Sequence, residues 1–304
     1  MTPAHARSLS WSELYSRAFQ VCADLWPLWV ARFLYLIINY GAFLLCLLCT
    51  FWPLVSEVMG SIRGNRSLSP ADSQALLLDF FSRFKDLGFL GAVAVIFLFY
   101  LLWWMVLSAW FNGGLYARLR AWVEKGEPFS WKAFVLDGFY HLIPMLLLQV
   151  ALGLMLFGFL IALLAAGFLG VFLLALVHCP AWLGILLALP LGFGFFLGLV
   201  AYGAFVLVCQ ACLIEEGAVG RTLEKAARIC QESGGRILKA ITALTLMVWL
   251  GVLVVELLFK GLELIPLMGF LFLLVDLGFR LLFYMFADVY FPALAVVCLP
   301  SRRR

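Results

Sequence analysis

A block of 73 residues, from Leu142 to Ile214, contains no Asp, Glu, Lys or Arg. A soluble domain cannot bury so long an apolar stretch around itself, so the block must lie in lipid. A hydrocarbon core about 30 Å thick takes roughly 20 helical residues, which makes the block too long for two minimal crossings and too short for four. Because lipid offers the backbone no hydrogen-bond partners, the lipid-facing parts must be helical. The sequence predicts two long spans, with two spans and a re-entrant piece as the alternative.

The composition extends this prediction to the whole chain. Of the 304 residues, 65% are hydrophobic and 12% are charged, which is typical of multi-span membrane proteins and leaves no soluble domain over. We expect an all-α, polytopic helical membrane protein that forms a single transmembrane domain over residues 1–304. The predicted spans are residues 28–52, 88–111, 142–177, 181–213, 237–259 and 267–299.

The segments between the spans carry the polar residues. Residues 10–26 have an amphipathic pattern with Ser10 and Glu13 in capping-box spacing, so we expect an interfacial helix. Residues 54–87 are predicted to form an external loop that contains a second amphipathic helix. Residues 112–141 and 214–236 are expected to be cytoplasmic linkers, each containing an amphipathic helix that precedes a pair of spans.

Glycine, alanine and proline mark three places inside the long block. His178 to Trp182 contains Pro180 and should be the turn between the two spans. Small residues recur every four positions at Gly158, Ala162, Ala166 and Gly170, which favours the close approach of another helix. Pro190 and Gly192 indicate a kink or an unwound turn, so a discontinuous helix that lines a substrate site, as in transporters, is the alternative to plain helix packing.

The basic residues predict the topology. With six spans, 15 Lys and Arg residues fall on one side and five on the other, or 14 against five if Arg32 lies in the membrane. The side richer in positive charge is cytoplasmic. We therefore expect a bacterial inner-membrane protein with both termini in the cytoplasm.

Ionisable residues within the last two spans are the candidate functional site, because charge is costly in lipid. Glu256 and Lys260 lie near the end of the fifth span, and a line of residues four apart follows the sixth. We expect Arg280 to pair with Asp276 or Glu256, and Asp288 to lie close to the bilayer midplane. A structural ion-paired cap and a functional proton or ion path both remain open. The candidate residues are Glu256, Lys260, Asp276, Arg280, Tyr284 and Asp288.

No pattern in the sequence indicates catalysis. There is no Ser/His/Asp order, no zinc-protease motif and no glycine-rich phosphate loop. The histidines His5, His141 and His178 are too scattered for an obvious metal site. We expect no catalytic residues, no cofactor, no metal and no nucleic-acid partner; the expected partners are membrane lipids and other protein chains or a second copy.

One stretch resembles a known group of proteins. Residues 213–217, Leu-Ile-Glu-Glu-Gly, are followed by residues 222–226, Thr-Leu-Glu-Lys-Ala, and by a glycine before the next span. This pattern resembles uncharacterised bacterial six-span proteins that are similar to the membrane domain attached to some glycerophosphodiester phosphodiesterases. The segment from Asn112 to Phe134 is similar to their second cytoplasmic linker. The resemblance implies a six-span fold but no active site, and no phosphodiesterase domain is present.

These observations favour a non-enzymatic inner-membrane protein that acts within an assembly or in handling lipids or envelope components. A small transporter or channel that uses the polar stripe on the sixth span is the alternative. An intramembrane enzyme is disfavoured because the required constellations are missing.

Overall fold

The computed structural model describes residues 10–63, 86–176, 181–232, 235–263 and 269–299, together with Gln74, Leu78 and Ser82. In some helical stretches, including residues 171–176, 181–191 and 269–274 and also Asp276, it describes only the backbone. The described residues form α-helices and no strand, and six helices are long and apolar enough to cross a membrane. The predicted class, an all-α polytopic membrane protein, is therefore confirmed.

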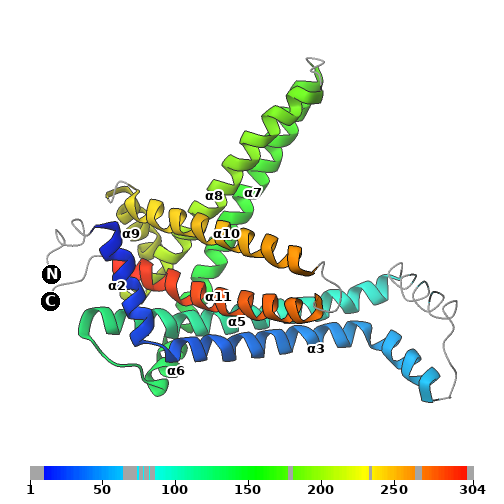
Figure 1. Cartoon of the computed structure of the whole chain (residues 1–304), viewed down its shortest axis with the longest axis horizontal. Helices are drawn as coiled ribbons and strands as arrows, with labels where there is room; N and C mark the ends of the chain where they lie inside the picture. Colours follow the sequence, from blue (N-terminus) through cyan, green and yellow to red (C-terminus); the bar gives the residue numbers. More distant parts are fainter. Residues whose placement is uncertain are drawn as a thin grey trace. The chain divides into compact units, whose positions relative to one another are not determined.

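The helices follow the predicted order (Figure 1). Four of them extend beyond the predicted spans, whereas the described parts of α7 and α11 lie within theirs. They are α2 (Trp11–Asp24), α3 (Pro27–Arg63), α5 (Leu87–Lys125), α6 (Trp131–Tyr140), α7 (Leu142–Leu176), α8 (Ala181–Glu216), α9 (Val219–Glu232), α10 (Arg236–Glu263) and α11 (Gly269–Cys298). The expected amphipathic helix within residues 54–87 falls almost entirely outside the described residues, as does the turn at His178 to Pro180.

The chain divides into two compact units. Unit 1 comprises residues 1–32 and 109–304, and unit 2 comprises residues 33–108. Unit 2 contains the later part of α3 and the earlier part of α5, which contact each other through Phe43 and Tyr100, with ring centroids 5.3 Å apart. Unit 1 contains the other helices and all the candidate residues.

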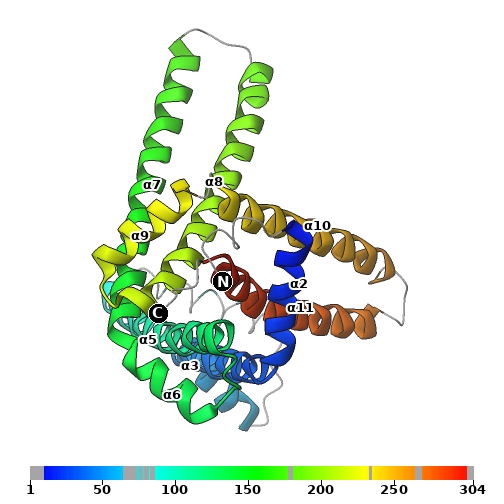
Figure 2. The same cartoon turned by 90° about the vertical axis from the view of Figure 1, so that its left-hand side faces the viewer.

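Helix α11 is the centre of unit 1. It packs against α10, α8 and α2, and Figure 2 shows α2 crossing α11. Of its most apolar window, 56% is buried, compared with 11% for α7. The buried residues of α11 lie mainly in its last third, where Ala293, Leu294 and Ala295 are fully buried.

Helix α5 does not end at Asn112 to Gly114, where we expected the second span to stop. A Cβ added at Gly114 would lie 2.7 Å from the carbonyl oxygen of Phe134, and one added at Gly138 would lie 2.8 Å from Trp110. These glycines let α6 approach α5 closely, so their role is packing. The helix α5 continues to Lys125, and Gly126 (φ 69°) ends it in the left-handed conformation.

The hairpin of α7 and α8, shown side by side in Figure 2, differs from two expectations. Helix α8 is unbroken through Pro190 and Gly192, so the unwound turn is absent and the discontinuous-helix alternative loses its structural basis. The ridge from Gly158 to Gly170 is exposed, and nothing lies within 4 Å of a Cβ added at Gly158 or Gly170. Among the described residues, no helix of the chain packs on this ridge.

The N-terminal helix α2 begins with the predicted capping box. The Ser10 amide donates to Glu13 Oε2 (2.7 Å), and the Glu13 amide donates to Ser10 Oγ (3.3 Å). The hydrogen bonds from the Ser10 backbone and side chain lower the pKa of Glu13 below its usual value. Helix α2 is fixed in unit 1 by tyrosines: the Tyr15 hydroxyl donates to the carbonyl oxygen of Ala240 (3.1 Å), and the Tyr290 hydroxyl donates to that of Tyr15 (3.0 Å).

Candidate functional site

The predicted polar stripe on α11 divides into two groups. At one end, Glu256 of α10 contacts Arg280 Nη2 at 3.6 Å and Lys260 Nζ at 3.3 Å. We call Glu256, Lys260 and Arg280 the α10–α11 cluster. The expected pair between Arg280 and Glu256 is thus present, whereas the side chain of Asp276 lies outside the described residues.

Asp288 forms the second group, with a partner that the sequence did not suggest. Arg32, on the second turn of α3, donates from Nε to Asp288 Oδ2 (2.9 Å) and also from Nη2 to the same oxygen. The guanidinium lies 5.4 Å from the ring centroid of Phe111. Tyr284, one turn from Asp288 on the same face of α11, is exposed. Among the described side chains of the stripe, the ion pairs therefore form two separate groups.

The neighbours of Asp288 place it at the level of α2. Phe286 contacts Phe19 of α2, with ring centroids 6.3 Å apart, and Tyr290 donates a hydrogen bond to the backbone of α2. The sequence predicts that Asp288 lies near the bilayer midplane, because about eleven residues separate it from the end of the sixth span at Leu299. If α2 lies in the interface, as its sequence predicts, Asp288 lies near the interface, because the contacts with α2 extend along α11 to either side of it.

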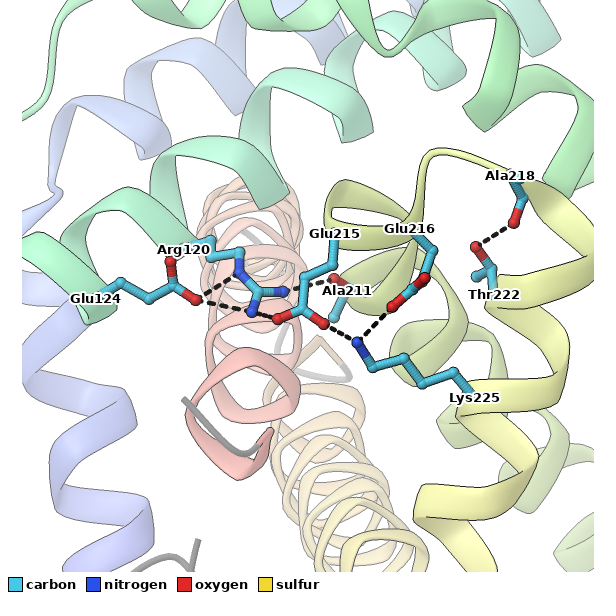
Figure 3. A network of polar contacts seen from close by, with 8 residues as sticks. All are labelled: Arg120, Glu124, Ala211, Glu215, Glu216, Ala218, Thr222 and Lys225. Carbon is cyan, nitrogen blue, oxygen red and sulfur yellow. Dashed lines mark hydrogen bonds and ion pairs between the residues drawn. The ribbon is translucent and has the colours of Figure 1, made fainter. Parts of the chain in front are cut away.

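A larger ionic group lies where α5, α8 and α9 meet (Figure 3). We call it the junction cluster; it consists of Arg120, Glu124, Glu215, Glu216 and Lys225. Arg120 Nη2 contacts Glu215 and also Glu124 Oε1 (2.7 Å), while Lys225 Nζ contacts Glu215 and also Glu216 Oε1 (2.7 Å). Glu215 is therefore shared between two cations that come from different helices.

The junction cluster is buried at its centre. The side chains of Arg120 and Glu215 are only 10% and 8% exposed, and Arg120 Nη1 also donates to the carbonyl oxygen of Ala211 (3.4 Å). A charge in such a place is stable only when it is paired and hydrogen-bonded. The cluster therefore fixes the ends of three helices relative to one another.

Local backbone features bring α9 to the cluster. Gly217 has φ 64° and its amide donates to the carbonyl oxygen of Leu213 (2.9 Å), which ends α8 after its two glutamates. Helix α9 then starts at Val219, and the hydroxyl of buried Thr222 donates to the carbonyl oxygen of Ala218 (2.8 Å). Lys225 is one turn further on and faces both glutamates (Figure 3).

Sequence reasoning missed the junction cluster as a site, although it contained a signal. That signal is the stretch on which the resemblance rests, which contains Glu215, Glu216, Gly217 and Lys225. The missing information was Arg120, which is 95 positions from Glu215 and lies beyond the expected end of its helix.

A smaller ionic contact holds α6 against α5. Arg118 Nη2 pairs with Asp137, and Arg118 Nη1 lies 3.9 Å from Glu127. His141, between α6 and α7, is buried, and this burial lowers its pKa below the usual value, although Asp137 acts in the opposite direction. The imidazole is therefore favoured in its neutral form.

The ionic groups described above are suited to holding helices together and to binding polar groups. Within the part of the chain that the structure describes, no group of three or more His, Cys, Asp or Glu side chains could hold a metal ion. The acids of the junction cluster, Glu124, Glu215 and Glu216, all contact cations in ion pairs. The carboxylate of Asp288 also pairs with a cation, Arg32, but its side chain is 41% exposed.

No protein family, no curated protein and no solved structure matches this chain. The resemblance to the six-span bacterial proteins stays a prediction that rests on residues 112–134 and 213–226.

Proposed function

We propose that this chain is a multi-pass protein of a bacterial inner membrane that handles lipids or other envelope components within a membrane assembly and catalyses no reaction. The six apolar helices make it a membrane protein. We also propose that the chain is related to the six-span proteins that resemble phosphodiesterase-linked membrane domains. Three residues of the resembling stretch, Glu215, Gly217 and Lys225, support this because they build the junction between α8 and α9.

The observation that carries the proposal is the unequal burial of the spans in unit 1. The most apolar windows of α11 and α8 are 56% and 39% buried, whereas those of α7 and α10 are 11% and 6% buried. Helices α8 and α11 form the core, and α7 and α10 present long apolar faces to whatever surrounds the chain. In a membrane, such faces contact lipid tails or other transmembrane helices.

The experiment that tests this proposal is purification of the full chain in mild detergent, followed by identification of the lipids and proteins that remain bound. We expect a defined set that a second inner-membrane protein, purified in the same way, does not retain. The variant Phe157→Ala, on the exposed face of α7, should reduce this set without lowering the melting temperature, since Phe157 is exposed. Retention no different from that of the second protein would contradict the proposal.

We also propose that both termini and the junction cluster are cytoplasmic, as the positive charges indicate. In a variant without native cysteines, Lys132→Cys on α6 should react with a membrane-impermeant thiol reagent only after the cells are opened. Met59→Cys, near the far end of α3, should react in intact cells, because Lys132 and Met59 are both exposed and a crossing separates them. Labelling of Lys132→Cys in intact cells would reverse the topology.

A small transporter is the second candidate, and one observation favours it: Asp288 is an incompletely buried carboxylate within a span. In proteoliposomes, an ion or solute flux that Asp288→Asn abolishes would support transport. The division of the polar stripe into two groups makes this candidate the weaker one.

A further inference from the structure

The pair of Arg32 and Asp288 has the chemistry of a headgroup site. Both hydrogen bonds from Arg32 end on Oδ2 of Asp288. Among the described residues, no hydrogen-bond partner is seen for Oδ1, and the side chain is 41% exposed. A carboxylate oxygen in this state is an acceptor that favours a charged N–H donor.

The surroundings place this acceptor at the depth of lipid headgroups. Asp288 lies at the level of α2, between Phe286 and Tyr290, which both contact that helix. The aromatic side chains of Trp11, Phe19 and Trp26 are exposed on and beside α2, and aromatic residues of this kind gather at the membrane interface. The position therefore meets headgroups rather than the middle of the acyl chains.

A mostly apolar track, with Arg280 of the α10–α11 cluster at its edge, leads from Asp288 along α11. Tyr284, Leu281 and Leu277 lie four, seven and eleven residues before Asp288, which places them on the same face of the helix. All three are exposed. The track is about 16 Å long at 1.5 Å per residue, comparable to half the thickness of the hydrocarbon core. One acyl chain can therefore lie along it while the headgroup is beside Asp288.

We propose that the Arg32–Asp288 pair binds the headgroup of phosphatidylethanolamine, with the lipid ammonium donating to Asp288 Oδ1 and the lipid phosphate beside the Arg32 guanidinium. A zwitterionic headgroup is complementary to an adjacent cation and anion. An anionic phosphatidylglycerol headgroup has no ammonium, and its phosphate would meet the Asp288 carboxylate. This inference rests on the proposed function, because it names the lipid class that the protein handles.

The test compares headgroups on the purified full chain by native mass spectrometry. Phosphatidylethanolamine, its N-methyl and N,N-dimethyl derivatives, phosphatidylcholine and phosphatidylglycerol are added at equal concentrations. We expect retention as long as the nitrogen carries a hydrogen, and a fall of about tenfold at phosphatidylcholine, the effect of one lost charge-assisted hydrogen bond. Equal retention of all five lipids, or a steady decline with headgroup size, would overturn the proposal.

Two variants test whether Asp288 is the source of the preference for phosphatidylethanolamine. Asp288→Asn should reduce the preference for phosphatidylethanolamine over phosphatidylcholine to about onefold, because the amide keeps the shape but loses the charge. Glu256→Gln, an equal change in the α10–α11 cluster, is the matched control and should keep the preference. If Asp288→Asn does not fold, the headgroup series on the native chain still decides, since it needs no variant. An unchanged preference in folded Asp288→Asn would overturn the proposal.

A water-soluble competitor shows whether the site binds a whole lipid or only a soluble amine. Glycerophosphoethanolamine carries the same headgroup without acyl chains, so it should not displace the lipid at equal concentration. Displacement at equal concentration would overturn the lipid assignment. The headgroup preference and the co-purification experiment are independent: a preference without a defined set of partners would contradict the proposed function alone, and the reverse result would contradict this inference alone.

Discussion

The junction cluster and the α10–α11 cluster are both ionic groups at the ends of membrane helices, but they differ in burial and in sharing. In the junction cluster, Arg120 and Glu215 are 10% and 8% exposed and come from α5 and α8. In the α10–α11 cluster, Arg280 and Glu256 are 33% and 31% exposed and 3.6 Å apart. The comparison teaches that a charge predicted to lie within a span is not always the charge that holds the fold together.

The largest expected effect is that of Arg120→Ala. This change leaves Glu215 buried with one cation instead of two, and breaking a buried pair costs about 3 kcal/mol or more. Chemical unfolding of the full chain in detergent would measure the loss. Arg228→Ala is the matched control on α9, because Arg228 pairs with Glu224 where both are exposed, and it should cost less than about 0.5 kcal/mol. Equal losses would remove the distinction between buried and exposed pairs.

A double replacement sharpens the comparison within the junction cluster. Arg120→Met combined with Glu215→Leu removes both buried charges, and apolar residues of similar size often replace such a pair at little cost. We expect a loss about 2 kcal/mol smaller than that of Arg120→Ala alone. Thermal melting of the two variants side by side would check this, and a double replacement that loses as much as Arg120→Ala or more would mean that the two residues do not act as a pair.

Arg280→Ala should have a smaller effect, about 1 kcal/mol. The loss is small because Glu256 keeps Lys260 at 3.3 Å as a second cation. Unfolding of Arg280→Ala beside Arg120→Ala gives the direct comparison. If Arg280→Ala proved the more damaging of the two, the α10–α11 cluster and not the junction would be the main ionic support.

The smallest expected effect is a dependence of stability on pH that comes from the buried imidazole of His141. Burial lowers the folded-state pKa of His141 below its ordinary 6.5, so the unfolded chain binds the proton more readily. The stabilisation is complete above about pH 6.5 and is lost as the pH falls below it. Melting temperatures at pH 7.5 and 5.5 should differ more for the native chain than for His141→Asn. The same pH dependence in both proteins would mean that His141 is as hydrated when folded as when unfolded.

The sequence allowed the class, the order of the helices and the capping box of α2 to be predicted, because hydropathy and cap chemistry are local. It did not allow the continuation of α5 through Gly113 and Gly114, since those glycines serve a contact with α6 that no local pattern reveals. It did not allow the pairs Arg32–Asp288 and Arg120–Glu215 either. Their partners are 256 and 95 positions apart, and only the packing of helices decides which charges meet.

The attachment of α2 to α10 and α11 has a consequence for how the chain is made. The hydroxyl of Tyr290 reaches the backbone of Tyr15 across 275 positions of sequence. At a synthesis rate of about 5 to 20 residues per second, Tyr290 follows Tyr15 out of the ribosome by roughly 14 to 55 s. During that interval Leu14, Ala18 and Cys22, which are buried in the finished protein, have no binding surface on α11. Helix α2 must therefore wait for α11, so the interface between them closes only after the spans that lie between them in the sequence have been synthesised.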